Sequence, residues 1–136
     1  MLDLKSRAAG SLIGQCLGDA LGFPVEGRSP EVCSRYVADT LRTGRAGERG
    51  RRGFAVGQYT DDSQLARELL QSFVRCGGFD PVDYGRAIAD IFETGRIVGR
   101  GRATEAAAQR IAAGVPWNQA GTPAPSAGNG SAMRAG

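Results

Sequence analysis

Apolar residues recur at helical spacing along most of this chain, and this periodicity constrains the fold more than any other feature. The segment 4–21 places apolar side chains about 3.6 residues apart, and similar patterns run through 60–76, 80–94 and 104–113. No alternating pattern of the kind that marks a strand competes with them. Because short connections separate the segments, we predict an all-α domain.

Turn-forming residues set the expected ends of these helices. Gly22-Phe23-Pro24 should close the first helix, and Ser29-Pro30 should open a short second helix that runs to Val37. Residues 40–57 read as a loop. The later helices should run from near Thr60 to Cys76 before Gly77-Gly78, from Asp80-Pro81 to Gly95 with Ile88, Ile91 and Phe92 buried, and from Thr104 to Gly114-Val115-Pro116.

Four glycines stand on one face of the first predicted helix, at Gly10, Gly14, Gly18 and Gly22. A glycine costs a helix about 1 kcal/mol relative to alanine. We therefore expect another backbone to pack closely against this face.

The sequence Thr60-Asp61-Asp62-Ser63-Gln64 places two adjacent carboxylates at the start of an apolar-periodic helix. Leu65, Leu69 and Phe73 follow Asp61 at four-residue steps, so Asp61 should head a stripe that faces the core. Carboxylates avoid such a place unless they are paired or bind a cation, and Thr and Asp oxygens suit Mg²⁺ or Mn²⁺. The alternative is ordinary capping, because acids in a first helical turn favour the helix dipole.

Composition excludes several other classes of protein. The 136 residues contain no histidine, which rules out histidine bases and histidine zinc sites, and Cys16, Cys33 and Cys76 suggest no disulfide framework. No apolar run is long enough to span a membrane, and the N-terminus lacks the features of a signal peptide. We expect a cytoplasmic protein.

The net charge of +3 comes largely from arginine. A glycine-rich stretch concentrates these charges at Arg42, Arg45, Arg49, Arg51 and Arg52. A basic patch of this kind could bind nucleic acid or another anion, but no nucleic-acid motif accompanies it. A solvated or disordered loop is the reading we prefer, and nucleic acid is not an expected partner.

Three segments together resemble the ADP-ribosylglycohydrolase family. They are Gly14-x-x-x-Gly18-Asp19-Ala20-Leu21-Gly22-Phe23-Pro24-Val25-Glu26, then Thr60-Asp61-Asp62-Ser63-Gln64, then Gly128-Asn129-Gly130-Ser131-Ala132-Met133-Arg134. Each motif alone is weak, but their order and spacing are specific. By composition the tail from Thr122 onward would otherwise read as a flexible terminus.

The resemblance implies an all-α, orthogonal multi-helix bundle with two divalent cations, usually Mg²⁺ and sometimes Mn²⁺. Thr60, Asp61 and Asp62 match the first metal-ligand motif, and Glu26 matches an acidic residue beside the metals and the scissile ribose. The resemblance also implies that the substrate, ADP-ribose on a protein or small molecule, is bound by glycine-rich segments at Gly99 and at Gly128, Asn129, Gly130, Ser131 and Met133. Asp19 lies in the first motif and is expected to support the metal ligands or to pack between helices rather than to bind metal itself.

The implied chemistry is hydrolysis of an N- or O-glycosidic bond at the ribose anomeric carbon, through an oxocarbenium-like state. A metal site orients hydroxyls and activates water, and a nearby carboxylate moves protons. Glu26 is the candidate for that proton transfer, and Asp61 and Asp62 are the metal-holding catalytic carboxylates. The residues alone do not divide the roles of base and ligand.

Two departures from the family pattern affect these expectations. Family members are about twice as long or more, and their C-terminal part carries a further Asp-x-Asp-Ser/Thr motif, so residues 1–136 are expected to be the N-terminal portion of one domain. An apolar face left uncovered would then favour aggregation or association with the missing half. Some members also carry an acid where this chain has Ile97-Val98, which leaves arginine-linked specificity open. The alternative function is a catalytically silent ADP-ribose-binding or crystallin-like structural relative.

Overall fold

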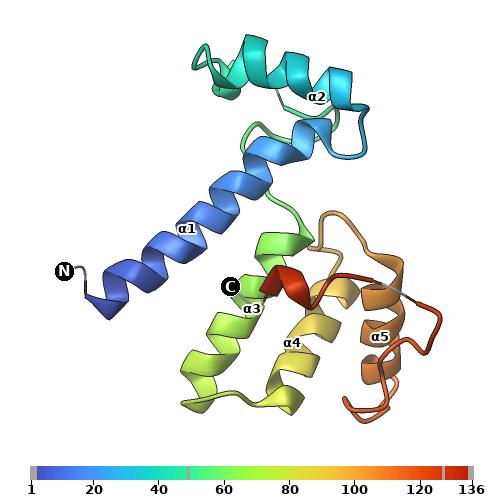
Figure 1. Cartoon of the computed structure of the whole chain (residues 1–136). Coiled ribbons are helices and arrows are strands. Elements are labelled where there is room, and N and C mark those ends of the chain that lie inside the picture. Colours follow the sequence, from blue (N-terminus) through green and yellow to red (C-terminus); the bar gives the residue numbers. More distant parts are fainter. Residues whose placement is uncertain (1–2, 49, 127, 135–136) are drawn as a thin grey trace. The chain divides into compact units, whose positions relative to one another are not determined.

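The computed structural model describes residues 3–48, 50–126 and 128–134, and these residues form helices and turns without strands (Figure 1). The predicted all-α class is therefore confirmed. The contacts divide the chain into two units, Met1–Thr60 and Asp61–Gly136. Within the described residues, no helix combines the length and apolarity needed to cross a bilayer.

The first unit begins with α1, Leu4–Gly22, which Asp3 caps by accepting a hydrogen bond of 2.7 Å from the Ser6 N–H. A 3₁₀ turn, Phe23–Val25, ends this helix at the predicted position. The second helix, α2, spans Pro30–Tyr36. It continues beyond its predicted end as a π-helical turn, Val37–Leu41, because the Arg42 N–H bonds the Val37 carbonyl.

The close backbone contact expected at the four glycines of α1 is not found among the described residues of the first unit. Apart from the backbone of the helix itself and adjacent residues, no described atom of this unit lies within 4 Å of where a Cβ would stand at any of them. Within this unit the apolar stripe of α1 is also uncovered, since α1 has no buried residue and Leu4, Ile13 and Leu17 are exposed. The buried groups of the unit include Phe23 and Tyr36 at the far end of α1, where the Tyr36 hydroxyl donates to the Leu21 carbonyl at 3.0 Å.

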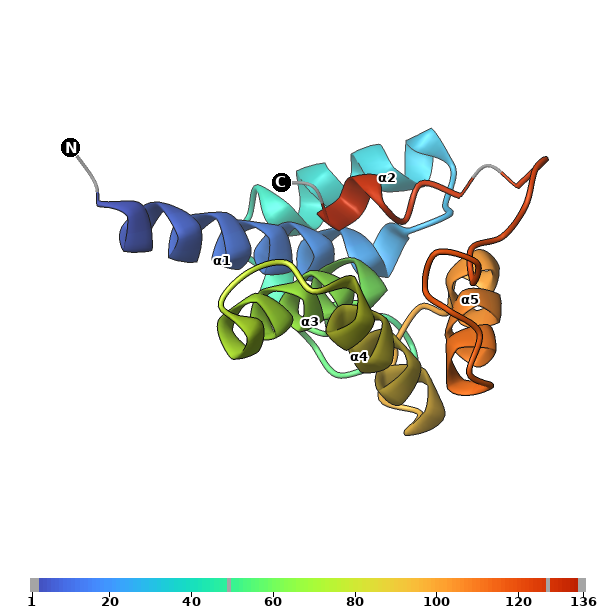
Figure 2. The same ribbon diagram turned by 90° about the horizontal axis from the view of Figure 1, so that it is seen from below.

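The second unit contains α3, Asp61–Cys76, α4, Pro81–Glu93, and α5, Arg102–Ala112, which lie side by side in both views (Figures 1 and 2). A last 3₁₀ turn, Ala132–Arg134, packs against α3. The predicted starts and stops are largely confirmed. Asp80 caps α4 by accepting from two N–H groups, and Gly77 and Gly95 take positive φ values of 70° and 66° after α3 and α4. The helix α5 begins two residues before its predicted start.

The core of the second unit is formed by Leu65, Ile91, Phe92, Ile97 and Ala108, with Ile88 packed at its edge. The burial of Ile91 and Phe92 is confirmed. The prediction for Phe73 is wrong, because its side chain is 42% exposed and its ring lies 6.0 Å from that of Phe79 near the surface. The stripe on α3 thus turns away from the core after Leu65 and the half-buried Leu69.

Candidate active site

Thr60 is fixed by two hydrogen bonds to Asp19 at the end of α1. Its N–H lies 2.8 Å from Asp19 Oδ2, and its hydroxyl lies 2.9 Å from Asp19 Oδ1. Thr60 is 5% exposed. Because the hydroxyl donates its proton to Asp19, its oxygen presents lone pairs to any other neighbour. In this position Asp19 holds Thr60, one of the predicted metal ligands.

Glu26 follows the 3₁₀ turn at the end of α1 and is exposed. Its carboxylate pairs with Arg51, with 3.0 Å between Oε2 and Nη1. Arg45, in the same arginine-rich stretch, pairs with Glu48 at 2.8 Å. Arg49 lies outside the described residues. Arg51 thus contacts a candidate catalytic residue, which the reading of this stretch as a solvated or disordered loop did not foresee.

Asp61 and Asp62 form the first turn of α3, as predicted, and both are half-buried. The Asp61 N–H donates to the Val98 carbonyl at 2.7 Å, which joins the helix to the loop between α4 and α5. A Cβ placed on Gly101 of this loop would stand 3.7 Å from Asp61 Oδ2. Asp61 therefore lies directly beside the loop that carries Gly99, the predicted substrate-binding residue.

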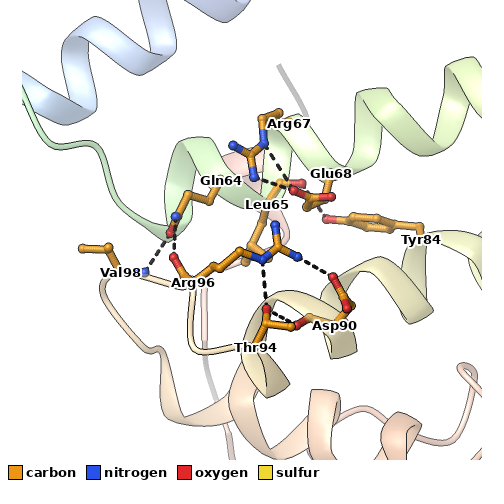
Figure 3. Close-up of polar contacts among 9 residues, drawn as sticks. All are labelled: Gln64, Leu65, Arg67, Glu68, Tyr84, Asp90, Thr94, Arg96 and Val98. Carbon is orange, nitrogen blue, oxygen red and sulfur yellow. Dashed lines mark hydrogen bonds and ion pairs between the residues drawn. The ribbon is translucent and has the colours of Figure 1, made fainter.

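Gln64, the last residue of the Thr60–Gln64 motif, clamps the same loop (Figure 3). Its Nε2 donates to the Arg96 carbonyl at 2.9 Å, and its Oε1 accepts from the Val98 N–H at 2.8 Å. The Gln64 side chain is buried beneath the loop. Arg96 in turn binds Thr94 and Asp90 at the end of α4. Sequence reasoning assigned Gln64 no role.

Thr104 marks the place where the two glycine-rich segments meet. A Cβ on Gly101 would stand 3.7 Å from Thr104 Oγ1, and a Cβ on Gly130 would stand 3.4 Å from the same atom. A Cβ on Gly128 would stand 3.7 Å from the Cβ of Ala103. The start of α5 therefore lies between the Gly99 loop and the Gly128–Ser131 segment. Thr104 was missed as a site residue, although a hydroxyl in the first helical turn after Gly99 and Gly101 was a visible signal.

The remaining predicted substrate-binding residues lie in the Gly99 loop and in the segment 128–133. Gly99 has a φ of 78°, which favours glycine, and is exposed. Asn129 and Ser131 are exposed in the segment that leads into the last 3₁₀ turn, whereas Met133 is half-buried. The Asn129 carbonyl accepts from the Ala132 N–H at 2.9 Å, so the segment folds back on itself.

Arg134 anchors the end of this segment beneath the Gly130 turn. Its Nη2 would lie 3.6 Å from a Cβ on Gly130. It also lies near Tyr84, whose hydroxyl donates to the Leu65 carbonyl at 3.2 Å (Figure 3). Burial raises the pKa of Tyr84, and the nearby Arg134 cation opposes that rise only in part. Tyr84 therefore stays protonated and acts as a fixed donor.

The second unit thus gathers one candidate metal carboxylate and both candidate substrate segments around the start of α5. Glu26, Asp19 and Thr60 belong to the first unit. In the ranges 3–48, 50–126 and 128–134, no three Cys, Asp or Glu side chains gather as a metal cluster. The assignment of Thr60, Asp61 and Asp62 as metal ligands stays a prediction.

Comparison with known proteins identifies the family. The model of the ADP-ribosylglycohydrolase family matches residues 1–136. This chain belongs to the ADP-ribosylglycohydrolase family.

Individual relatives agree with this assignment. The chain is 33% identical over 104 residues to ADP-ribosylhydrolase ARH3 of Xenopus tropicalis, covering 65% of this chain and 29% of that protein. It is 30% identical over 135 residues to ADP-ribosylarginine hydrolase Tri1 of Pseudomonas putida (strain GB-1), covering 94% of this chain and 34% of that protein. An uncharacterized protein of Archaeoglobus fulgidus is 28% identical over 118 residues, covering 87% of this chain and 38% of its own length. The chain spans about a third of the length of these relatives.

Proposed function

We propose that this chain forms part of a metal-dependent hydrolase that removes ADP-ribose from a modified acceptor by cleaving the glycosidic bond at the ribose anomeric carbon. The observation that carries the proposal is that Asp61 lies beside the Gly99 loop, and that this loop and the Gly128–Ser131 segment meet at the start of α5. Family membership and the names of two relatives agree with it.

The residues present fit a hard divalent cation. Asp61 and Asp62 offer carboxylate oxygens, and the Thr60 hydroxyl, which donates to Asp19, has lone pairs to offer. Gly101 leaves room beside Asp61 Oδ2 that a side chain would fill. Magnesium bound there would supply Lewis-acid chemistry at the ribose hydroxyls. Two such ions are expected in the complete site, and manganese is the alternative.

The start of α5 suits the diphosphate of ADP-ribose. Gly101 precedes the helix and makes no side-chain cap, so the first turn directs N–H groups outward with the positive end of the helix dipole. The glycines on either side, Gly99 and Gly130, let a backbone approach closely. In this proposal these segments bind the diphosphate and orient the ribose.

Glu26 would move the proton at the scissile bond through its carboxylate. A carboxylate near an anomeric carbon serves as general acid or base in glycoside hydrolysis. The acceptor stays open among arginine, serine, a nucleic-acid end and a small molecule. Ile97 stands where some family members carry an acid. Its apolar side chain is buried in the core, 6% exposed, and supplies no carboxylate for the chemistry.

Calorimetric titration of ADP-ribose into this chain, with and without Mg²⁺, tests the proposal. We expect saturable binding that requires the metal and that falls at least tenfold in Asp61→Asn. Glu93→Gln, which removes an exposed carboxylate elsewhere in the second unit, is the matched control and should bind normally. Unchanged binding by Asp61→Asn would contradict the proposed metal site.

Chromatographic assay of ADP-ribose released from ADP-ribosyl-arginine and ADP-ribosyl-serine peptides completes the test. Release that requires the metal supports hydrolysis. Binding of ADP-ribose by the complete protein without release from any acceptor would instead favour the catalytically silent binding protein.

A further inference from the structure

The guanidinium group of Arg51 makes three contacts with the single turn that carries Glu26. Its Nη1 lies 3.0 Å from Glu26 Oε2 and 3.4 Å from the Phe23 carbonyl oxygen, and its Cζ lies 4.7 Å from the centroid of the Phe23 ring. We propose that Arg51 is the positioning residue that fixes the carboxylate of Glu26 for catalysis. This inference rests on the role proposed for Glu26.

Arg51 is well placed to act as a fixed support because its own surroundings are ordered by packing. Phe23 is 6% exposed, and the ring of Phe54 meets it edge-on at 5.0 Å and 76°. The Phe54 N–H bonds the Arg51 carbonyl at 2.9 Å. A Cβ on Gly50 would stand 3.4 Å from the Phe54 carbonyl oxygen, so the loop folds tightly around Arg51. The cation thus lies on a buried ring, where cation–π attraction restrains it.

Glu26, by contrast, has little else to restrain its side chain. Its N–H bonds the Phe23 carbonyl at 3.3 Å, and the next residue, Gly27, has a φ of 72°, so the backbone forms a tight turn. The Glu26 side chain is 67% exposed, and a free glutamate at such a site samples many rotamers. The ion pair with Arg51 selects one of them. It uses Oε2 and leaves Oε1 for the proton transfer.

The expected role is geometric rather than a contribution to stability. An ion pair with partly exposed partners adds little to folding free energy. Positioning a reacting group, however, has large effects on rate, because small displacements from the reactive geometry slow catalysis strongly. Arg45 lies in the same stretch and pairs with Glu48 at 2.8 Å. It therefore provides a matched control.

Hydrogen exchange followed by mass spectrometry tests the restraint directly on this chain. Arg51→Met keeps the apolar stem on Phe23 and removes the charge. We expect it to raise the exchange rate of the amides of residues 26 and 28 about threefold to tenfold. Arg45→Met should leave these amides unchanged, and Arg51→Lys should lie between the two. Equal exchange in the Arg51→Met and Arg45→Met variants would overturn the proposal, whatever the activity of the protein.

A double-mutant cycle with Glu26→Gln tests the catalytic consequence. Arg51→Met should lower kcat for ADP-ribose release about tenfold, with KM unchanged. In the Glu26→Gln background the same substitution should have no further effect on kcat, because its target is already lost. A kcat loss of equal size in both backgrounds would show a general structural role and overturn the positioning role. Failure of the complete protein to release ADP-ribose from any acceptor would instead refute the proposed function, and the exchange contrast would still decide whether Arg51 restrains the turn.

Discussion

Replacing Gln64 by methionine should destabilise the second unit strongly. Methionine has nearly the same length and removes both hydrogen bonds to the loop after α4, those to the Arg96 carbonyl and the Val98 N–H. Each buried backbone group that loses its partner costs about 1–3 kcal/mol. The buried apolar methionine side chain offsets part of the cost of the two unpaired groups. We therefore expect the free energy of unfolding to fall by about 2–4 kcal/mol.

The matched control is Gln71→Met, which makes the same change two turns later on α3 at an exposed position. Thermal and urea unfolding followed by circular dichroism measure both variants. For a chain of this size the expected loss at Gln64 corresponds to a decrease in Tm of about 10 °C, and Gln71→Met should change Tm by about 2 °C or less. Equal effects at the two positions would refute the argument that Gln64 clamps the loop.

Gln64→Glu separates the two hydrogen bonds of the clamp. It keeps an acceptor for the Val98 N–H but places an oxygen against the Arg96 carbonyl at neutral pH. Burial and this repulsion would raise the pKa of the new carboxyl group in the folded state. Protonation would then restore a donor, so the stability lost at neutral pH should be partly regained as the pH falls through that raised pKa. Loss of stability that is independent of pH would contradict the proposed donor–acceptor pattern.

Three further predictions follow from single contacts. Leu65→Ala empties the centre of the second unit and should lower the free energy of unfolding by about 3 kcal/mol in urea titration, because Leu65 is fully buried among Ile91 and Phe92. Asp80→Ala should cost about 1 kcal/mol by the same assay, whereas Ser29→Ala should cost less, since Ser29 makes no side-chain capping bond. The hydrogen bond from Arg75 lowers the pKa of Asp83, so its stabilisation is present above the unfolded pKa of about 4 and is lost as the pH falls through the lowered value. The Tm of Asp83→Asn should therefore lie below that of wild type at pH 7 and approach it near pH 2, whereas a gap that stays constant would refute the linkage.

The helices and most of their ends were predictable because their signals are local. Asp80 lies directly before the helix it caps, and Gly77 and Gly95 directly follow helices that they help to end. The Thr60-Asp61-Asp62 motif was likewise visible because its members are neighbours in sequence. The clamp by Gln64 and the pair between Arg51 and Glu26 were not visible, since they join residues 32, 34 and 25 positions apart. Nothing in a local pattern shows which distant loop a buried amide or an arginine will reach.

The apolar stripes of α1 and α3 show how far periodicity in the sequence predicts burial in the structure. In α3, Leu65 is fully buried because α4, α5 and the Ile97 loop supply its partners within the second unit. In α1, a stripe of the same period leaves Ile13 and Leu17 exposed, because no described element of the first unit covers them. Periodicity therefore identifies the face that requires burial, whereas its burial depends on partners elsewhere in the fold. The same reasoning applies to the metal motif. Thr60, Asp61 and Asp62 are visible because they are neighbours in sequence. A ligand contributed by a distant segment must instead be found by measuring how single substitutions change the affinity for Mg²⁺.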